Sequence, residues 1–334
     1  MTNQNSSIIQ CQRNVGPHNL THIPEFYLMG LSEDTELQPI LSGLFLSMYL
    51  ITVLGNVLII LAVNCDPHLH TPMYFFLSKL SLVDICFIST TVPKMIVDIQ
   101  THNRIISYVG CLTQMSFLII FGCMDYMLLT VMAYDRFVAI CQPLHYSIIM
   151  NPRLCAMLVF ASCLVSILDS QLHNLIVLEF VYLKDIEISS FFCEPTIILN
   201  LDCSETVAKT IITYCLGMIF AFFPILIILS SYYKIVSCIL KITSLGGRYK
   251  AFSTCGSHLS VVCLFYGTAI GQYLESVVSN SSRQGVVSSI MYAIVTPMLN
   301  PFIYSLRNTD ILNTLRRLYS RKFSCQVLSK PISM

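Results

Sequence analysis

Seven long runs of apolar residues dominate the sequence and limit what the chain can fold into. Each is close to the roughly 20 residues that a helix needs to cross the hydrocarbon core of a bilayer. Because backbone groups have no water partners in lipid, we expect these runs to be helices rather than irregular chain. The runs are Ile40–Val63, Tyr74–Val97, Cys111–Cys141, Leu154–Leu178, a span within Val207–Leu240, Phe252–Leu274 and Val286–Leu306. The sequence therefore predicts an all-α fold, a seven-transmembrane helix bundle over residues 40–306.

Charged residues are too scarce for a soluble protein of this length. They make up 11% of the 334 residues, against about 25% in an ordinary soluble domain. A formal net charge of +1 also disfavours nucleic-acid binding, which requires a basic surface. A multi-pass membrane protein is the class that remains.

The basic residues predict which end of the bundle faces the cytoplasm. With the N-terminus outside, twelve Lys and Arg side chains fall on the inner side and six on the outer side, with Lys79 inside the membrane. This asymmetry is the one that cytoplasmic loops usually carry. We therefore expect an extracellular N-terminal segment at residues 1–39 and a cytoplasmic tail at 307–334. Glycosylation triplets at Asn5 and Asn19 agree with this orientation.

Two of the fifteen cysteines stand out by position. Cys111 opens the third span on the outer side, and Cys193 lies in the long outer loop after the fourth span. Because both face an oxidising compartment, we predict a disulfide between them. Most of the other cysteines lie within the spans and are read as small packing residues. Cys203, which is also outside, has no predicted partner.

Short sequence motifs at the ends of the spans indicate which kind of multi-pass membrane protein this is. They are Gly55-Asn56, Leu69-His70-Thr71-Pro72-Met73-Tyr74, Met132-Ala133-Tyr134-Asp135-Arg136-Phe137-Val138-Ala139-Ile140-Cys141, Ser231-Tyr232, Lys250-Ala251-Phe252-Ser253-Thr254-Cys255-Gly256-Ser257-His258-Leu259 and Pro297-Met298-Leu299-Asn300-Pro301-Phe302-Ile303-Tyr304. Together they resemble the vertebrate odorant receptors, which are rhodopsin-like G-protein-coupled receptors. The resemblance runs from about Glu25 to Asn308.

The sequence departs from the pattern of that family at two places. Phe137 stands where the family usually has Tyr after the Asp-Arg pair. The family also commonly has three cysteines in the long outer loop, and Tyr182 or Leu183 stands near the place of the first. A second loop disulfide through Cys203 is therefore not predicted.

Two carboxylates inside the membrane are candidates for an ion site. Asp84 and Asp125 fall near mid-membrane, where charges are costly and usually functional. Two neighbouring carboxylates repel each other unless a proton or cation lies between them. The resemblance implies a sodium site at this pair. The alternative is two separately hydrogen-bonded carboxyls with Asn56 and Asn300 as partners.

The resemblance also implies a conformational switch at the inner end and a heterotrimeric stimulatory G protein as partner, which raises cAMP. The switch residues would be Asp135, Arg136, Tyr232, Asn300, Pro301 and Tyr304. Read without the resemblance, the Asp-Arg pair could be an ion pair at the membrane edge. Pro301 removes a backbone hydrogen bond and is expected to kink the seventh helix. The inner basic residues follow equally from the bias of cytoplasmic loops and from attraction to anionic lipid.

Family analogy places a ligand cavity in the outer half of the bundle. Its proposed lining is Leu118, Ile119, Gly122, Cys123, Ile211, Cys215, Met218, Tyr266, Ala269, Ile270 and Tyr273. Taken singly, each is more often a packing residue, and the hypothesis concerns the group. Because the lining has no charged side chain, a small, mostly apolar, uncharged odorant is expected. Leu118 stands where aminergic receptors have an acid, which disfavours an amine.

Other function classes fit the sequence less well. We find no metalloprotease or serine-hydrolase motif, and therefore expect no enzyme and no cofactor beyond a structural sodium ion. A retinal-type pump would need a lysine in the seventh span, and Val286–Leu306 has none. A secondary transporter would show internal repeats and broken helices in pairs. Seven spans without a visible repeat favour the receptor.

Overall fold

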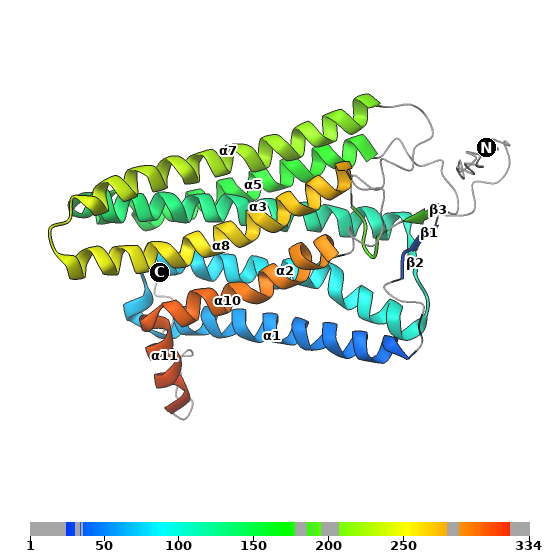
Figure 1. Ribbon diagram of the computed structural model, residues 1–334, viewed down its shortest axis with the longest axis horizontal. Coiled ribbons are helices and arrows are strands. Elements are labelled where there is room, and N and C mark those ends of the chain that lie inside the picture. The colour runs from blue at the N-terminus through cyan, green and yellow to red at the C-terminus, as the bar shows by residue number, and fades with distance from the viewer. Residues whose placement is uncertain are drawn as a thin grey trace, which may run out of the picture.

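A computed structural model describes residues 25–30, 34, 36–177, 186–188, 190–194, 207–278 and 287–320. Seven long helical segments run side by side along the molecule, as Figure 1 shows. They are α1 (Leu37–Cys65), α2 (Pro72–Thr101), α3 (Tyr108–Cys141), α5 (Pro152–Val177), α7 (Val207–Leu240), α8 (Leu245–Val278) and the segment in which η4 (Met291–Val295) continues into α10 (Thr296–Arg307). The predicted all-α bundle of seven helices is confirmed.

The helices α1, α2, α3 and α8 are several residues longer than the apolar runs that predicted them. In the described part of the chain, six are long and apolar enough to cross a membrane. The exception is α8, which is interrupted by small and polar residues such as His258, Gly267 and Gln272. α8 begins at Leu245, well before the apolar run at Phe252. The helix thus extends beyond its hydrophobic stretch, because its backbone hydrogen bonds also form outside the lipid.

Three short strands cover one end of the bundle, which we call the strand end. β1 (Glu25–Leu28) pairs antiparallel with β2 (Ile105–Ser107) and parallel with β3 (Ile186–Ile188). Phe26 and Leu28 are buried against α3 while Glu25 and Tyr27 are exposed, the alternation expected of a strand with one covered face. Strands of three or four residues are too short to show this alternation in the sequence. Residues 25–28 are thereby held against the bundle.

Short helical turns join the main helices, and a further helix lies at the opposite end. The turns are η1 (Pro67–Leu69), η2 (Pro143–His145) and α4 (Tyr146–Ile149). α11 (Thr309–Ser320) projects across the bundle axis at what we call the α11 end, in Figure 1. The Thr314 hydroxyl donates to Asp66 Oδ2 at 2.6 Å, and Arg317 Nη2 lies 3.0 Å from the same oxygen. These contacts, the Thr314 hydrogen bond foremost, hold the pKa of Asp66 below its usual value.

α3 is the central helix of the bundle. It contacts α2, α5, α7 and α8, and its buried residues include Leu118, Asp125 and Asp135. α1, α5 and α7 instead present many large apolar side chains on the outside of the molecule. A surface of this kind suits lipid, because lipid replaces water as the solvent of these side chains. Functional groups on α3 are therefore shielded on all sides.

Gly55 lets α1 and α10 approach closely. A Cβ atom at this position would lie 3.0 Å from Pro301 Cγ and 3.1 Å from Pro301 Cβ. Pro301 lies inside α10, and the π-helical turn η4 precedes that helix. The rigid ring of Pro301 cannot rotate away from an added side chain. Glycine at position 55 is therefore a packing requirement of this helix pair.

Gly55→Val is expected to destabilise the protein by about 1–3 kcal/mol, the usual cost of overpacking a close contact. Gly43→Val is the matched control, because it makes the same change in the same helix and its Cβ would meet no atom within 4 Å. Thermal unfolding of the purified protein in detergent measures both. Equal melting temperatures for the two variants would contradict the packing role of Gly55.

Candidate functional site

A disulfide holds the long loop after α5 against α3 at the strand end. Cys111 and Cys193 are joined, with their Cα atoms 5.5 Å apart. The backbone N–H of Cys193 also donates to Gln114 Oε1 of α3 at 3.1 Å. Phe191 and Phe192 beside it are buried. Residues 190–194 of this loop, which we call the roof, therefore lie over the strand end of the bundle.

The predicted ligand-contacting residues of α3 lie in the interior below that roof. Leu118, Gly122 and Cys123 are buried, and Ile119 is half-buried. The hydroxyl of Tyr292 would lie 2.8 Å from a Cβ at Gly122. Glycine thus makes room for a tyrosine hydroxyl in the centre of the bundle. The thiol of Cys123 points toward Ser166 and Asp169 of α5.

Helix α8 contributes two of its four predicted lining residues. Tyr266 is buried, with its ring centroid 5.2 Å from that of Tyr126 on α3. Ala269 is half-buried. Ile270 is 50% exposed on the outside of the bundle, so it does not belong to the lining. The side chain of Tyr273 lies outside the described residues.

The lining residues predicted on α7 face the wrong way. Ile211, Cys215 and Met218 share one helix face, but that face is exposed on the outside of the molecule. α7 is apolar on nearly all sides, so residue spacing alone cannot fix its rotation about its own axis. The prediction for these three residues was wrong in orientation, although it placed them on the right helix.

Glu194 is a buried carboxyl group that sequence reasoning missed. It follows Cys193 directly within the roof, and its Oε1 accepts hydrogen bonds from Gln272 Nε2 at 2.8 Å and Ser289 Oγ at 3.3 Å. Burial raises the pKa of Glu194 to about 7. Its position next to the disulfide-bonded cysteine was the available signal, because the disulfide forces the next residue against the bundle.

α5 also carries a buried polar pair that the sequence analysis did not single out. His173 Nδ1 lies 3.2 Å from Asp169 Oδ1, one helical turn away, and both side chains are buried. Next to them, Asn174 Nδ2 donates to the Ser116 hydroxyl of α3 at 2.9 Å. Asn174 thus joins α5 to α3 through a polar contact that lipid could not provide.

The two predicted ion-site carboxylates are both buried and close enough for their charges to repel. Asn300 Nδ2 donates to both oxygens of Asp84, at 2.9 and 3.1 Å. Asn56 donates instead to the carbonyl of Thr52 within its own helix. Asp125 Oδ1 has no hydrogen-bond partner among the described residues.

The free oxygens around this pair fit a hard cation. Asn56 Oδ1 and Asn300 Oδ1, like Asp125 Oδ1, are buried acceptors that lack a partner among the described residues. Buried oxygens without a donor are costly, and hard cations such as sodium prefer oxygen ligands of this kind. The residues present are therefore suited to hold a sodium ion between Asp84 and Asp125.

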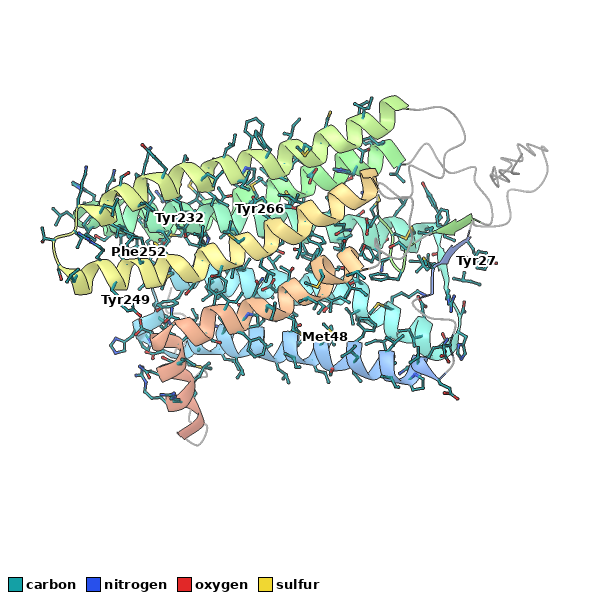
Figure 2. All side chains as sticks on the ribbon, in the orientation of Figure 1. Tyr27, Met48, Tyr232, Tyr249, Phe252 and Tyr266 are labelled. Atoms are coloured by element: carbon teal, nitrogen blue, oxygen red, sulfur yellow. A yellow bond between two sulfur atoms is a disulfide. The ribbon has the colours of Figure 1, made fainter. Side chains whose placement is uncertain are left out.

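The predicted switch residues gather toward the α11 end. Asp135 is buried and accepts a hydrogen bond from Tyr146 of α4 at 2.8 Å. The described residues contain no ion pair between Asp135 and Arg136. Figure 2 shows Tyr232 on the bundle between Tyr266 and the end marked by Tyr249 and Phe252. Tyr304 is buried nearby, close enough to Tyr232 for the two hydroxyls to interact.

His258 of α8 contacts both α7 and α3, and it was not among the predicted switch residues. Its Nδ1 lies 2.7 Å from the Tyr232 hydroxyl of α7, and its Nε2 lies 3.1 Å from the Leu129 carbonyl of α3. We assign the proton to Nε2, because a carbonyl can only accept; Nδ1 then accepts from Tyr232. The motif that contains His258 was recognised from the sequence, but its contacts depend on three helices and were not foreseeable.

Several sequence predictions concern parts of the chain that the structure leaves undescribed. Asn5, Asn19, Cys203 and Tyr182 lie outside the described residues, as does the whole of the tail after Ser320.

The fold is similar to that of squid rhodopsin. The superposition with its crystal structure has a TM-score of 0.69 and covers 89% of each chain, at 18% sequence identity. This likeness concerns the fold alone.

Sequence comparison is more specific. Residues 45–322 match the family model described as olfactory receptor. The chain is 65% identical to mouse Olfactory receptor 7E178 over 93% of its length and 94% of the relative's. It is also 65% identical to human Olfactory receptor 7E24, over 93% and 92% respectively. This family consists of multi-pass membrane receptors rather than enzymes. The chain belongs to the olfactory receptor family of G-protein-coupled receptors.

Proposed function

We propose that the protein binds a small, mostly apolar, uncharged odorant beneath the roof at the strand end and activates a stimulatory, olfactory-type G protein at the α11 end, which raises cAMP. The observation that carries this proposal is the set of buried contacts along α3. Its Gln114 contacts the roof, its Gly122 contacts Tyr292, and its Leu129 contacts His258. The single helix α3 thus contacts both the roof, where the odorant is proposed to bind, and residues toward the α11 end, where the G protein is proposed to bind.

The proposed orientation places the strand end and residues 1–39 outside the cell and the α11 end with the tail at 307–334 in the cytoplasm, with the bundle at 40–306 in the plasma membrane. The twelve-to-six distribution of basic residues supports it. The disulfide supports it too, because Cys111 and Cys193 would then face an oxidising compartment. Asn5 and Asn19 would be available for glycosylation.

The proposed ligand cavity uses the interior residues Leu118, Ile119, Gly122, Cys123, Tyr266 and Ala269. Their buried positions support recognition of the odorant mainly by shape. The exposed residues of α7 and Ile270 are not part of this proposal.

The proposed sodium ion would be held by Asp84 and Asp125, with the amide oxygens of Asn56 and Asn300 completing its surroundings. When bound, the ion would neutralise the repulsion between the two carboxylates. Asn300 precedes Pro301 in α10, so its contact with Asp84 ties the ion site to the helix that carries Tyr304.

The proposed receptor activity is tested by cAMP measurement in cells that express the protein with or without the olfactory stimulatory G protein. A chemically broad odorant panel is expected to raise cAMP only where this G protein is present. Arg136→Ala is expected to abolish the response at unchanged surface expression, because Arg136 lies among Tyr232, His258 and Tyr304 at the α11 end.

Lys241→Ala is the matched control, since Lys241 is an exposed basic residue at the same end of the bundle. It is expected to keep most of the response. Transport of a solute that does not depend on the G protein would contradict the receptor function and favour the secondary transporter instead.

A further inference from the structure

A carboxyl group lies in the roof of the proposed ligand cavity, where the sequence pattern indicated no charge. Glu194 is 7% exposed, and its side chain lies between α8 and the helical segment that begins at Val287. Its two hydrogen-bond donors, Gln272 and Ser289, come from these two helices. Burying a carboxyl group in such a place costs free energy unless hydrogen bonds or an opposite charge compensate it.

Both donors contact the same oxygen atom. Gln272 Nε2 and Ser289 Oγ donate to Oε1, and no described residue donates to Oε2. A carboxylate can accept several hydrogen bonds on each oxygen. The geometry therefore fixes the side chain through Oε1 and leaves Oε2 available to a further donor.

Glu194 faces the interior rather than the solvent. Ser289 and Tyr292 are one helical turn apart and so lie on the same face of their helix. The hydroxyl of Tyr292 reaches the position above Gly122, and the charge of Glu194 acts on Tyr292. Glu194 therefore lies above the tyrosine that borders the proposed cavity, next to the buried Phe191 and Phe192.

We propose that Glu194 is a specificity-determining residue whose Oε2 accepts a hydrogen bond from the hydroxyl group of the odorant. This inference rests on the proposed receptor function and deepens it. An alcohol can donate to Oε2 while its apolar chain extends toward Leu118 and Tyr266. A methyl ether of the same shape has no donor, and a carboxylate would be repelled.

The protonation state of Glu194 gives a second signature. The pKa of about 7 means that the carboxyl changes from mostly neutral to mostly ionised between about pH 6 and pH 8. Because Oε1 already receives two donors, the proton of the neutral form belongs on Oε2. That form can donate to a carbonyl odorant, whereas the ionised form can only accept.

The groups packed around Glu194 do not titrate in the same range. α8 contributes the amide of Gln272, and the helix after Val287 contributes Ser289 and the phenol of Tyr292. The neighbouring Cys193 is held in the disulfide. Within the described residues, Glu194 is therefore the group of this cluster that titrates near neutral pH, and loss of the pH dependence in Glu194→Gln assigns the change in odorant preference to it.

The test compares straight-chain primary alcohols with their methyl ethers, the matching aldehydes and the matching amines in the cAMP assay. At neutral pH the wild type is expected to respond to an alcohol at a roughly tenfold lower concentration than to its methyl ether. The ratio of alcohol to aldehyde potency is expected to rise between about pH 6 and pH 8. Glu194→Gln is expected to remove both the preference and its pH dependence.

Two further variants separate recognition from folding. Glu194→Asp keeps the carboxyl group and is expected to keep the pH dependence of the ratio at reduced potency. Glu36→Gln is the matched control, because it neutralises an exposed carboxyl group near the strand end; it is expected to behave like the wild type. Surface expression is measured for each variant.

An alcohol-to-ether ratio that is the same in the wild type and in Glu194→Gln would overturn the inference while the receptor function stands. An amine that is more potent than the alcohol would also overturn it, in favour of recognition of an ammonium ion. If no odorant in the broad panel raises cAMP, the proposed function fails and this inference fails with it.

Discussion

Cys193→Ser is expected to destabilise the receptor by about 4.5 kcal/mol, the loop-closure contribution of a disulfide that spans this much chain. Cys111 and Cys193 are 82 residues apart in the sequence, so the unfolded chain gains much freedom when the bond is absent. The folded protein also loses the tie that holds the roof against α3. We expect the variant to reach the cell surface poorly and to melt at a markedly lower temperature in detergent.

Cys263→Ser provides the control for the disulfide. Cys263 is a free, exposed cysteine on α8, so its replacement removes a thiol without removing a bond. Its melting temperature and surface expression are expected to match those of the wild type. A Cys193→Ser variant that melts like Cys263→Ser would show that the roof is held by its other contacts.

The number and order of the helices could be predicted because the bilayer imposes them. A run such as Ile40–Val63 has no stable alternative to a helix in lipid, and α1 spans it from Leu37 to Cys65. The same principle made Asp84 and Asp125 recognisable, since a charge within an apolar run is conspicuous. The structure buries both of them together.

The rotation of a helix about its own axis was harder to predict. On α3, buried Asp125 and Asp135 mark the inner face, and Leu118 and Gly122 follow at helical spacing. α7 has no such marker over its outer half, so the choice of Met218 for the interior rested on analogy, and the structure exposes it. An apolar face turned to lipid looks the same in the sequence as one turned to a ligand.

Contacts between distant segments could not be predicted from local patterns. His258 lies in a recognised motif, yet its partners Tyr232 and Leu129 belong to other helices. Glu194 was not singled out from the sequence at all. Only the fold shows that the disulfide turns this residue inward, between Gln272 and Ser289.

This burial predicts a dependence of stability on pH. The pKa of Glu194 is about 7 in the folded protein, against 4.5 for an unburied side chain. Between these values the folded state binds more protons than the unfolded state, so the free energy of unfolding falls as the pH rises. The contribution of the neutral carboxyl is complete below about pH 4.5 and is lost above about pH 7. A shift of this size corresponds to about 3 kcal/mol.

Glu194→Gln isolates this contribution from the other titrating groups. A glutamine amide resembles the neutral carboxyl in shape and never ionises, so the variant and the wild type are expected to be similarly stable near pH 5. Near pH 8 the variant is expected to be more stable by up to about 3 kcal/mol. Melting of both purified proteins across this range in the same detergent measures the difference.

The sign of the stability difference between Glu194→Gln and the wild type near pH 8 shows whether a positive charge stabilises the ionised carboxylate. If the ionised form of Glu194 were stabilised by a positive charge, the wild type would be the more stable protein near pH 8, because loss of the charge pair would penalise the variant. The amide of Gln272 and the hydroxyl of Ser289 supply no positive charge. The folded protein therefore retains an ionised Glu194 at a cost, and a hydroxyl group that donates to Oε2 would offset part of that cost. Odorant binding should accordingly raise the melting temperature more near pH 8 than near pH 5.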